Sequence, residues 1–201
     1  MDQRAAAVDD DSDAHLRETT VRSDEVFRGR LLEVRRDVIR LPDGGEATRE
    51  FIVHPGAVMI VPILDDGRLV MERQWRYPLE RVMLEFPAGK LEPGEPTLRC
   101  AMRELEEETG YRATEWALAG TLHNAIAYSN ERIEVWFARG LSAGAAHLDA
   151  GEFLETRIVG VDELDRLCAS GGVTDAKTLV GLLWLQNWQA GRWDIAWRAP
   201  I

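Results

Sequence analysis

The sequence is short of the features that mark several classes of protein. It contains only two cysteines, Cys100 and Cys168, and neither belongs to a CxxC pair or to a Cys/His cluster with metal-ligand spacing. No apolar run approaches the roughly 18 residues of a membrane-spanning helix, and the start shows no signal-peptide pattern. We therefore expect a cytoplasmic protein with no disulfide framework, no zinc site and no membrane partner.

Positive charge is also in short supply. The 201 residues include 24 Lys and Arg against 35 Asp and Glu, which gives a net charge of −11 at pH 7. Binding to a nucleic-acid backbone depends on Lys and Arg neutralising phosphates, so this balance argues against nucleic acid as a partner. The acidic net charge does not exclude a compact phosphorylated ligand, because a few arginines and a divalent cation suffice to hold its phosphates.

The pattern along the chain predicts one domain with an appendage. Residues 1–20 hold six acidic residues, two arginines and almost no large apolar side chain, which predicts a mobile acidic tail. Apolar and polar residues then alternate on both sides of "PDGG", which predicts a small antiparallel β-ribbon unit over residues 21–55. Residues 56–201 would form the main domain.

The main domain reads as an α/β fold. Residues 57–75 repeat the hairpin pattern with "DDG" as the turn, and residues 87–96 are rich enough in Pro and Gly to predict a loop. A helix is expected over residues 97–109, ending at Gly110. Further strands are expected at 116–122, 132–139 and 154–161, and helices at 162–171 and 174–188. Together these predict a sandwich with helices on both sides of a mixed sheet.

The helix over residues 97–109 concentrates like charge in "RELEEETG". On a helical wheel its apolar side chains form one stripe that should face the sheet: Leu98, Ala101, Met102 and Leu105. Glu104 and Glu108 stand one above the other beside this stripe, and Glu107 continues the same flank outward. Glu106 falls on the opposite flank, where solvation is expected.

Two features favour a metal site over a merely solvated acidic face. Glu104 has Glu108 at i+4, which is a repulsive pair where a stabilised solvent face would place Lys or Arg. The flank is also partly covered by the sheet, so these charges need a cation, and Mg²⁺ or Mn²⁺ fits carboxylate oxygens. Arg103 lies four residues before Glu107 and can orient it, although an ordinary surface ion pair is the alternative.

The segment "GKLEPGEPTLRCAMRELEEETGY" resembles the Nudix box, the signature of hydrolases that act on a nucleoside diphosphate linked to another moiety. Every fixed position of the box is present: Gly89, Glu95, Arg103, Glu104, Glu107, Glu108 and Gly110, with Leu105 at the aliphatic position. Tyr111 stands where an aliphatic residue is usual. The resemblance implies the Nudix α/β/α sandwich.

The resemblance also implies roles for these residues. Glu104 and Glu108 would be the principal metal ligands, with Glu107 bound directly or through water and the carbonyl of Ala88 adding an oxygen. Gly89 would allow close approach of the backbone to the ligand. Glu95 and Arg103 would hold the loop and the carboxylates in place.

Outside the box the chain resembles the ADP-ribose pyrophosphatase branch, in segments such as "QWRYPLERVMLEFPAG" and "VTDAKTLVGLLWLQ". The resemblance implies a homodimer that exchanges its N-terminal ribbons. Such an exchange needs a large shared surface, and Trp75, Trp184 and Trp188 are candidates for burial in the core or near the dimer contact. The resemblance also assigns substrate binding to Arg76, for which a solvent-exposed strand-end arginine is the alternative.

One departure concerns the substrate. Ile126 and Ala127 stand where this branch carries a Pro-Gly marker of ADP-ribose specificity. The expected reaction is therefore hydrolysis of the pyrophosphate bond of ADP-ribose or of related nucleoside diphosphate sugars. Dinucleotides or damaged nucleoside triphosphates are the alternative substrates, and a non-catalytic nucleotide-binding regulator is the alternative class.

The attacking water needs a base, and no Ser/His/Asp or Cys/His arrangement is apparent among the four histidines. The resemblance places the base on a glutamate of a mobile loop, which is "HLDAGEFLETR" in this chain. Glu152 is the first candidate and Glu155 the second, because a strand from Leu154 would fix Glu155 toward one face. The alternative is that both are solvated loop acids.

Overall fold

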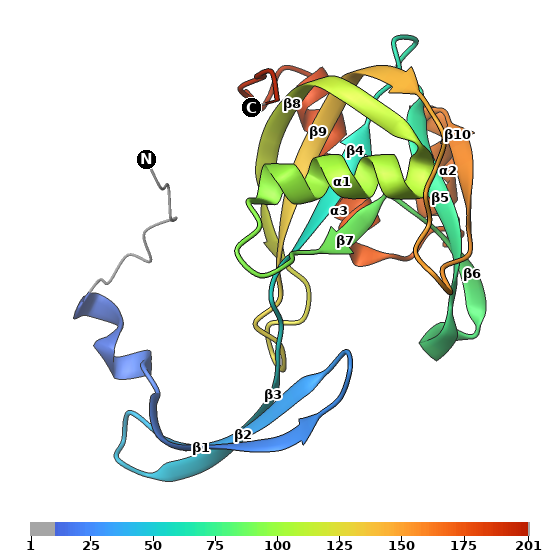
Figure 1. Cartoon of the computed structure of the whole chain (residues 1–201). Coiled ribbons are helices and arrows are strands. Elements are labelled where there is room, and N and C mark those ends of the chain that lie inside the picture. Colours follow the sequence, from blue (N-terminus) through green and yellow to red (C-terminus); the bar gives the residue numbers. More distant parts are fainter. Residues whose placement is uncertain (1–10, 201) are drawn as a thin grey trace. The chain divides into compact units, whose positions relative to one another are not determined.

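The computed structural model describes residues 11–200, and these form two compact units (Figure 1). The N-terminal unit contains the described residues up to His54 together with residues 125–130. The main unit contains residues 55–124 and 131–200. Within residues 11–200 no helix is both long and apolar enough to cross a membrane.

The N-terminal unit is built on a three-stranded antiparallel sheet in the order β1-β2-β3, with β1 at Thr19–Arg28, β2 at Glu33–Arg40 and β3 at Glu46–Val53. The turn between β2 and β3 closes with the Leu41 N–H donating to the Gly45 carbonyl at 2.8 Å, at the "PDGG" segment. Part of the range predicted as a tail is regular in the structure: Asp11–Leu16 forms a short 3₁₀ helix, η1, and β1 begins at Thr19. Residues 1–10 of that predicted tail lie outside the described residues.

The main unit contains two sheets. The four-stranded sheet has the order β7-β4-β9-β8, and its strands are β4 Ala57–Pro62, β7 Ala88–Lys90, β8 Tyr111–His123 and β9 Arg132–Ala143. It is mixed, because β4 and β9 are parallel while the other pairs are antiparallel.

The second sheet is antiparallel in the order β10-β5-β6, with β5 Leu69–Arg76, β6 Arg81–Glu85 and β10 Leu154–Val159. A short 3₁₀ helix, η2 at Tyr77–Leu79, joins β5 to β6.

Two local predictions were wrong. The "DDG" turn forms, but its arms pair only at Ile63 and Leu69 and then enter different sheets, because the fully buried β4 pairs with β7 and β9 instead. Residues 87–96 were predicted as a loop throughout, whereas Ala88–Lys90 forms β7 and pairs with the start of β4. Proline is tolerated beside an edge strand, and the three residues of β7 at the edge of its sheet contain no proline.

Helices cover both faces of the four-stranded sheet, as the predicted sandwich requires. Val58 and Ile60 of β4 face α1 (Thr97–Thr109), whose Leu98 and Leu105 belong to the same buried cluster. Met59 and Val61, which alternate with them, face the opposite side. That side is covered by α2 (Val161–Ala169) and α3 (Ala176–Gln189), and Figure 1 shows α1 on one side of β4 and α3 on the other. The α/β/α fold is therefore confirmed.

The tryptophans named from the sequence occupy different environments. Trp188 packs edge-on against Phe137 with ring centroids 6.0 Å apart, and Trp184 also packs against the core beneath α3. Trp75 on β5 is 55% exposed. Two of the three therefore contribute to the core, and Trp75 leaves an aromatic surface on the main unit.

Candidate active site

Helix α1 carries the acidic residues, and the sequence dictates both of its ends. Pro96 precedes its first turn with an extended backbone, and Gly110 ends it with φ of 75°. A Cβ at Gly110 would lie 2.7 Å from the Gly144 carbonyl oxygen, so only glycine fits this stop. The predicted bounds of the helix are confirmed, and the glutamates therefore lie on the flank that the wheel assigned to them.

Burial increases along this flank toward the sheet. Side-chain exposure is 38% for Glu107 and 13% for Glu104, and Glu108 is buried. Burial raises the pKa of Glu104 above its usual range. Burial also raises the pKa of Glu108, and the neighbouring carboxylates of Glu72, Glu104 and Glu152 raise it further. The ionised forms of these carboxyl groups are thus costly without a partner, and a cation would stabilise them.

Strand β7 lies directly against these carboxylates. The Ala88 N–H donates to Oε2 of Glu108 at 3.1 Å. A Cβ at Gly89 would lie 1.9 Å from the carboxyl carbon of Glu104, so the absence of a side chain at Gly89 is what allows the Glu104 carboxylate to lie there. The two residues that precede the long loop of the box therefore form the wall opposite Glu104 and Glu108.

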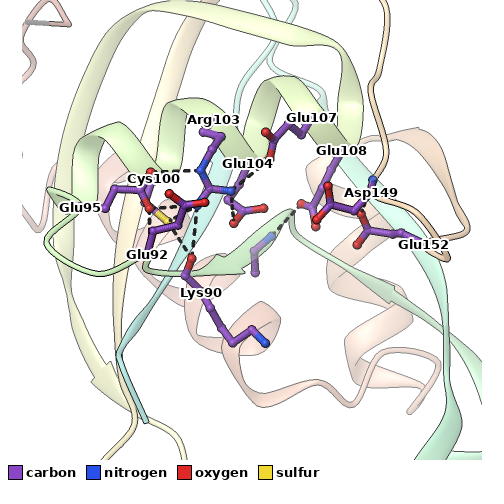
Figure 2. A network of polar contacts seen from close by, with 11 residues as sticks. Lys90, Glu92, Glu95, Cys100, Arg103, Glu104, Glu107, Glu108, Asp149 and Glu152 are labelled. Atoms are coloured by element: carbon purple, nitrogen blue, oxygen red, sulfur yellow. Dashed lines mark hydrogen bonds and ion pairs between the residues drawn. The ribbon is translucent and has the colours of Figure 1, made fainter. Parts of the chain in front are cut away.

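Arg103 links the outer carboxylates (Figure 2). Its Nε and Nη2 each donate to Glu95 at 3.0 Å, and its Nη1 donates to Glu104 at 2.8 Å and to Glu107 at 3.0 Å. The guanidinium lowers the pKa of Glu95 to about 2. Arg103 also donates to the Lys90 carbonyl at 3.3 Å, so it ties the loop to the helix. Glu106, by contrast, pairs with Arg112 on the other flank.

These residues suit a hard divalent cation, although the ligands do not yet converge. Within residues 11–200 no group of three carboxylate, imidazole or thiol side chains is already arranged as a metal site. The carboxylates of Glu104 and Glu108 nevertheless offer the oxygen donors that such a cation prefers, and the Ala88 N–H already donates to Glu108. Glu72 adds a fully buried carboxylate whose two oxygens both lack a hydrogen-bond partner within the described residues. Orphaned buried oxygens of this kind fit a cation.

The two loop acids lie in different places. Glu152 accepts hydrogen bonds at 3.4 Å from the Gln74 amide and from the Asp149 N–H, and Figure 2 shows Glu152 beside Glu108. Glu155 instead pairs with Arg73 at 2.8 Å and is largely exposed. Glu155 and Arg73 are cross-strand partners, so they share the face of β5 opposite to Gln74. The structure brings Glu152 to the carboxylates of α1 and does not bring Glu155 there.

Arg76 lies at the end of β5 in a cluster of paired charges. It forms a bidentate pair with Glu85 at 2.7 and 2.9 Å, and Lys177 of α3 contacts the same carboxylate. Lys177 also contacts Asp175 at 3.0 Å. Arg76 and Lys177 line one pocket together with Ala88 and Gly89 of β7 and with Asn124 and Glu131. The pocket thus places three basic side chains, Arg76, Lys90 and Lys177, and two acidic ones, Glu131 and Asp175, beside strand β7.

The marker positions Ile126 and Ala127 belong to the N-terminal unit. They lie in a turn in which the Ala125 carbonyl accepts hydrogen bonds from the N–H groups of Tyr128 and Ser129, at 3.0 and 2.9 Å. Ile126 is almost fully exposed. An exposed apolar side chain at this position is available to a ligand or a partner, and the local geometry does not depend on a proline.

Comparison with known proteins agrees with this geometry. The model of the NUDIX domain matches residues 53–179, and that of the nucleoside diphosphate sugar hydrolase N-terminal domain matches residues 18–52. The chain belongs to the Nudix family. It is therefore a Nudix hydrolase, and hydrolases of this family generally use divalent metal ions.

Relatives of this Nudix hydrolase carry several names. It is 37% identical over 173 residues to the ADP-ribose pyrophosphatase of Bacillus subtilis, and the aligned region covers 85% of this chain and 94% of that protein. It is 36% identical over 175 residues to the methanol dehydrogenase activator of Bacillus methanolicus, covering 86% and 95%. A solved ADP compounds hydrolase superposes with a TM-score of 0.79 at 27% identity, covering 88% of this chain and 97% of that one.

Sequence reasoning missed three residues of this Nudix hydrolase's site. Glu72 lies beside Glu108, and Glu85 pairs with both Arg76 and Lys177. A signal for Glu72 was present, because "ERQWR" places Glu72, Gln74 and Arg76 at period two on one face of β5. No local pattern pointed to Lys177, since it comes to Arg76 only through the packing of α3.

Proposed function

We propose that this Nudix hydrolase cleaves the pyrophosphate bond of ADP-ribose or of a related nucleoside diphosphate sugar, giving a nucleoside monophosphate and a sugar phosphate, with Mg²⁺ as cofactor and Mn²⁺ as a substitute. The observation that carries this proposal is the placement of partly buried Glu104 and buried Glu108 on one flank of α1, opposite Ala88 and Gly89. The B. subtilis relative and the matched N-terminal domain support the class of substrate.

The metal-ligand role falls to Glu104 and Glu108, with Glu107 and the Ala88 carbonyl as further oxygen donors. When bound, divalent cations would neutralise the pyrophosphate oxygens and lower the pKa of an attacking water. Glu95 and Arg103 keep the acidic flank in position, because Arg103 bridges the loop and three carboxylates. Gly89 keeps the space in front of Glu104 free of a side chain.

Substrate binding and proton transfer fall to residues around this flank. Arg76 and Lys177 supply positive charge to a pocket that Gly89 also lines, and this suits phosphate oxygens. Glu152 is the proposed general base, because it is the loop carboxylate that lies beside Glu108 and is held by Gln74. The proton of the attacking water would pass to a carboxylate oxygen of Glu152.

The reaction is tested with purified protein, Mg²⁺ and a panel of ADP-ribose, ADP-glucose, a dinucleotide and nucleoside triphosphates, with products separated by chromatography. ADP-ribose should give AMP and ribose 5-phosphate, and EDTA should abolish the reaction. Because Ile126 replaces the marker proline, at least one other nucleoside diphosphate sugar should fall within about tenfold in kcat/KM. Rapid cleavage of triphosphates alone would contradict the substrate class.

The same proposal includes a homodimer. Several apolar side chains on each unit are more than half exposed in the single chain, among them Phe27 and Leu31 on the N-terminal unit and Trp75 and Phe153 on the main unit. Exposed apolar residues in such numbers mark an interaction surface, and a second copy would cover them. Light scattering at micromolar concentration should give about twice the mass of 22.6 kDa. A monomer mass would remove the homodimer and leave the chemistry standing.

A further inference from the structure

Glu72 is a buried carboxylate outside the Nudix box. It lies on β5 with none of its surface exposed, and neither of its carboxylate oxygens has a hydrogen-bond partner within residues 11–200. A buried polar group without a partner is costly, and a carboxylate is more costly than most. The nearby Glu85 already has two cationic partners, Arg76 and Lys177. Glu72 has no comparable partner in the structure.

The direction of Glu72 follows from the strand. Glu72, Gln74 and Arg76 alternate along β5 and so share one face. Gln74 on this face contacts Glu152, and Arg76 lines the pocket with Gly89. Glu72 continues the row to Glu108, with which it interacts electrostatically. The row therefore follows the candidate active site, and Glu72 is its most deeply buried member.

We propose that Glu72 binds a divalent cation together with Glu108, as a further carboxylate of the metal centre. The proposal rests on the proposed function in that it assumes a metal centre at Glu104 and Glu108. It extends that centre from the helix to the sheet: Glu108 comes from α1 and Glu72 from β5, two elements whose backbones are fixed by the surrounding core.

A divalent cation would give both buried carboxylates a partner at once. Two carboxylates buried side by side repel one another when both are ionised, and a cation between them removes the repulsion and supplies both with a partner. Water is a poor substitute, because neither residue has appreciable exposed surface. Glu107 is less suited to this deep position, because it is more exposed and already accepts a hydrogen bond from Arg103.

The test is binding of Mn²⁺ to the full-length protein without substrate, followed by electron paramagnetic resonance of the free ion and by calorimetry. Glu72→Gln should weaken binding of one ion at least tenfold or remove one ion from the stoichiometry. Glu115→Gln is the matched control, because it removes one charge from a carboxylate that pairs with Arg139 on the exposed side of β8. It should bind Mn²⁺ as the wild type does.

Two further measurements make the result decisive. The melting temperature of metal-free Glu72→Gln should equal or exceed that of the wild type, and Glu72→Asp, which keeps the charge, should recover part of the affinity. Wild-type affinity and stoichiometry in Glu72→Gln would overturn the proposal and assign to Glu72 a protonated, purely structural role. If the wild type binds Mn²⁺ but hydrolyses no nucleoside diphosphate sugar, the proposed substrate class fails while this inference stands.

Discussion

The Glu104 carboxylate occupies the space in which a side chain at Gly89 would stand, since a Cβ there would lie 1.9 Å from both the carboxyl carbon and Oε1 of Glu104. This relationship couples a glycine of the sheet edge to a carboxylate of the helix. It predicts a variant that damages the metal centre without damaging the fold, because the atoms that would clash are the far end of a flexible side chain.

Gly89→Ala should lower kcat/KM about 10- to 100-fold by displacing the Glu104 carboxylate, a loss typical of misplaced catalytic groups. Its melting temperature should stay close to that of the wild type. Gly160→Ala is the control, because its φ of −72° suits alanine and nothing lies within 4 Å of the added Cβ. Near wild-type kinetics in Gly89→Ala would contradict the role of Glu104.

Glu108→Gln should lower turnover by about 100-fold or more, because it removes a proposed metal ligand with almost no change of shape. The metal-free variant should be at least as stable as the wild type. Burial raises the pKa of Glu108, so above pH 4.5, the ordinary value of a glutamate, folding must protonate this carboxyl or bury its charge, and stability falls as the pH rises; Gln removes that cost.

Calorimetric melting with and without Mg²⁺ checks this prediction. Mg²⁺ should raise the melting temperature of the wild type by mass action and leave that of Glu108→Gln nearly unchanged. Glu106→Gln is the control, since Glu106 lies on the opposite flank and pairs with Arg112. An equal Mg²⁺ response in all three proteins would place the metal elsewhere.

The sequence predicted the helix of the site more fully than the sheet around it. The bounds of α1 follow from local chemistry, namely an apolar stripe, a preceding proline and a glycine that alone fits the stop at Gly110. Which strands pair is not local. The arms of the "DDG" turn enter different sheets because β4 finds its partners in β7 and β9, the second of which lies about 75 residues further along the chain.

The same distinction applies to the site residues. The box glutamates lie within one turn-and-helix segment, so their spacing was sufficient to predict a common flank. Glu85 reaches Arg76 across the β5–β6 pair, whereas Lys177 reaches Glu85 only because α3 packs beside β6, and no sequence spacing contains that second contact. Glu72 is an intermediate case: its alternation with Gln74 and Arg76 fixes its face, but its neighbour Glu108 comes from tertiary packing.

Glu152→Gln should lower kcat strongly, by about 100-fold or more, with little change in KM, because a general base acts in the transition state. Glu155→Gln should keep most of the turnover, because Glu155 pairs with Arg73 on the other face of the sheet. Steady-state kinetics with ADP-ribose distinguishes the two. A large loss in Glu155→Gln with normal turnover in Glu152→Gln would transfer the role to Glu155.

Glu95 should make the fold sensitive to acid. Its hydrogen bonds with Arg103 lower its pKa to about 2, so the carboxylate stabilises the fold at neutral pH, and this contribution is lost as the pH falls from about 4.5 toward 2. Glu95→Gln should therefore lower the free energy of unfolding at pH 7 by about 1 to 3 kcal/mol and reduce the difference between pH 7 and pH 3. Urea unfolding at both pH values measures this, and Glu115→Gln should have a smaller effect because the Glu115 carboxylate pairs with Arg139 where solvent screens the pair. A Glu95→Gln variant with the wild-type pH dependence would show that the pair with Arg103 does not stabilise the fold.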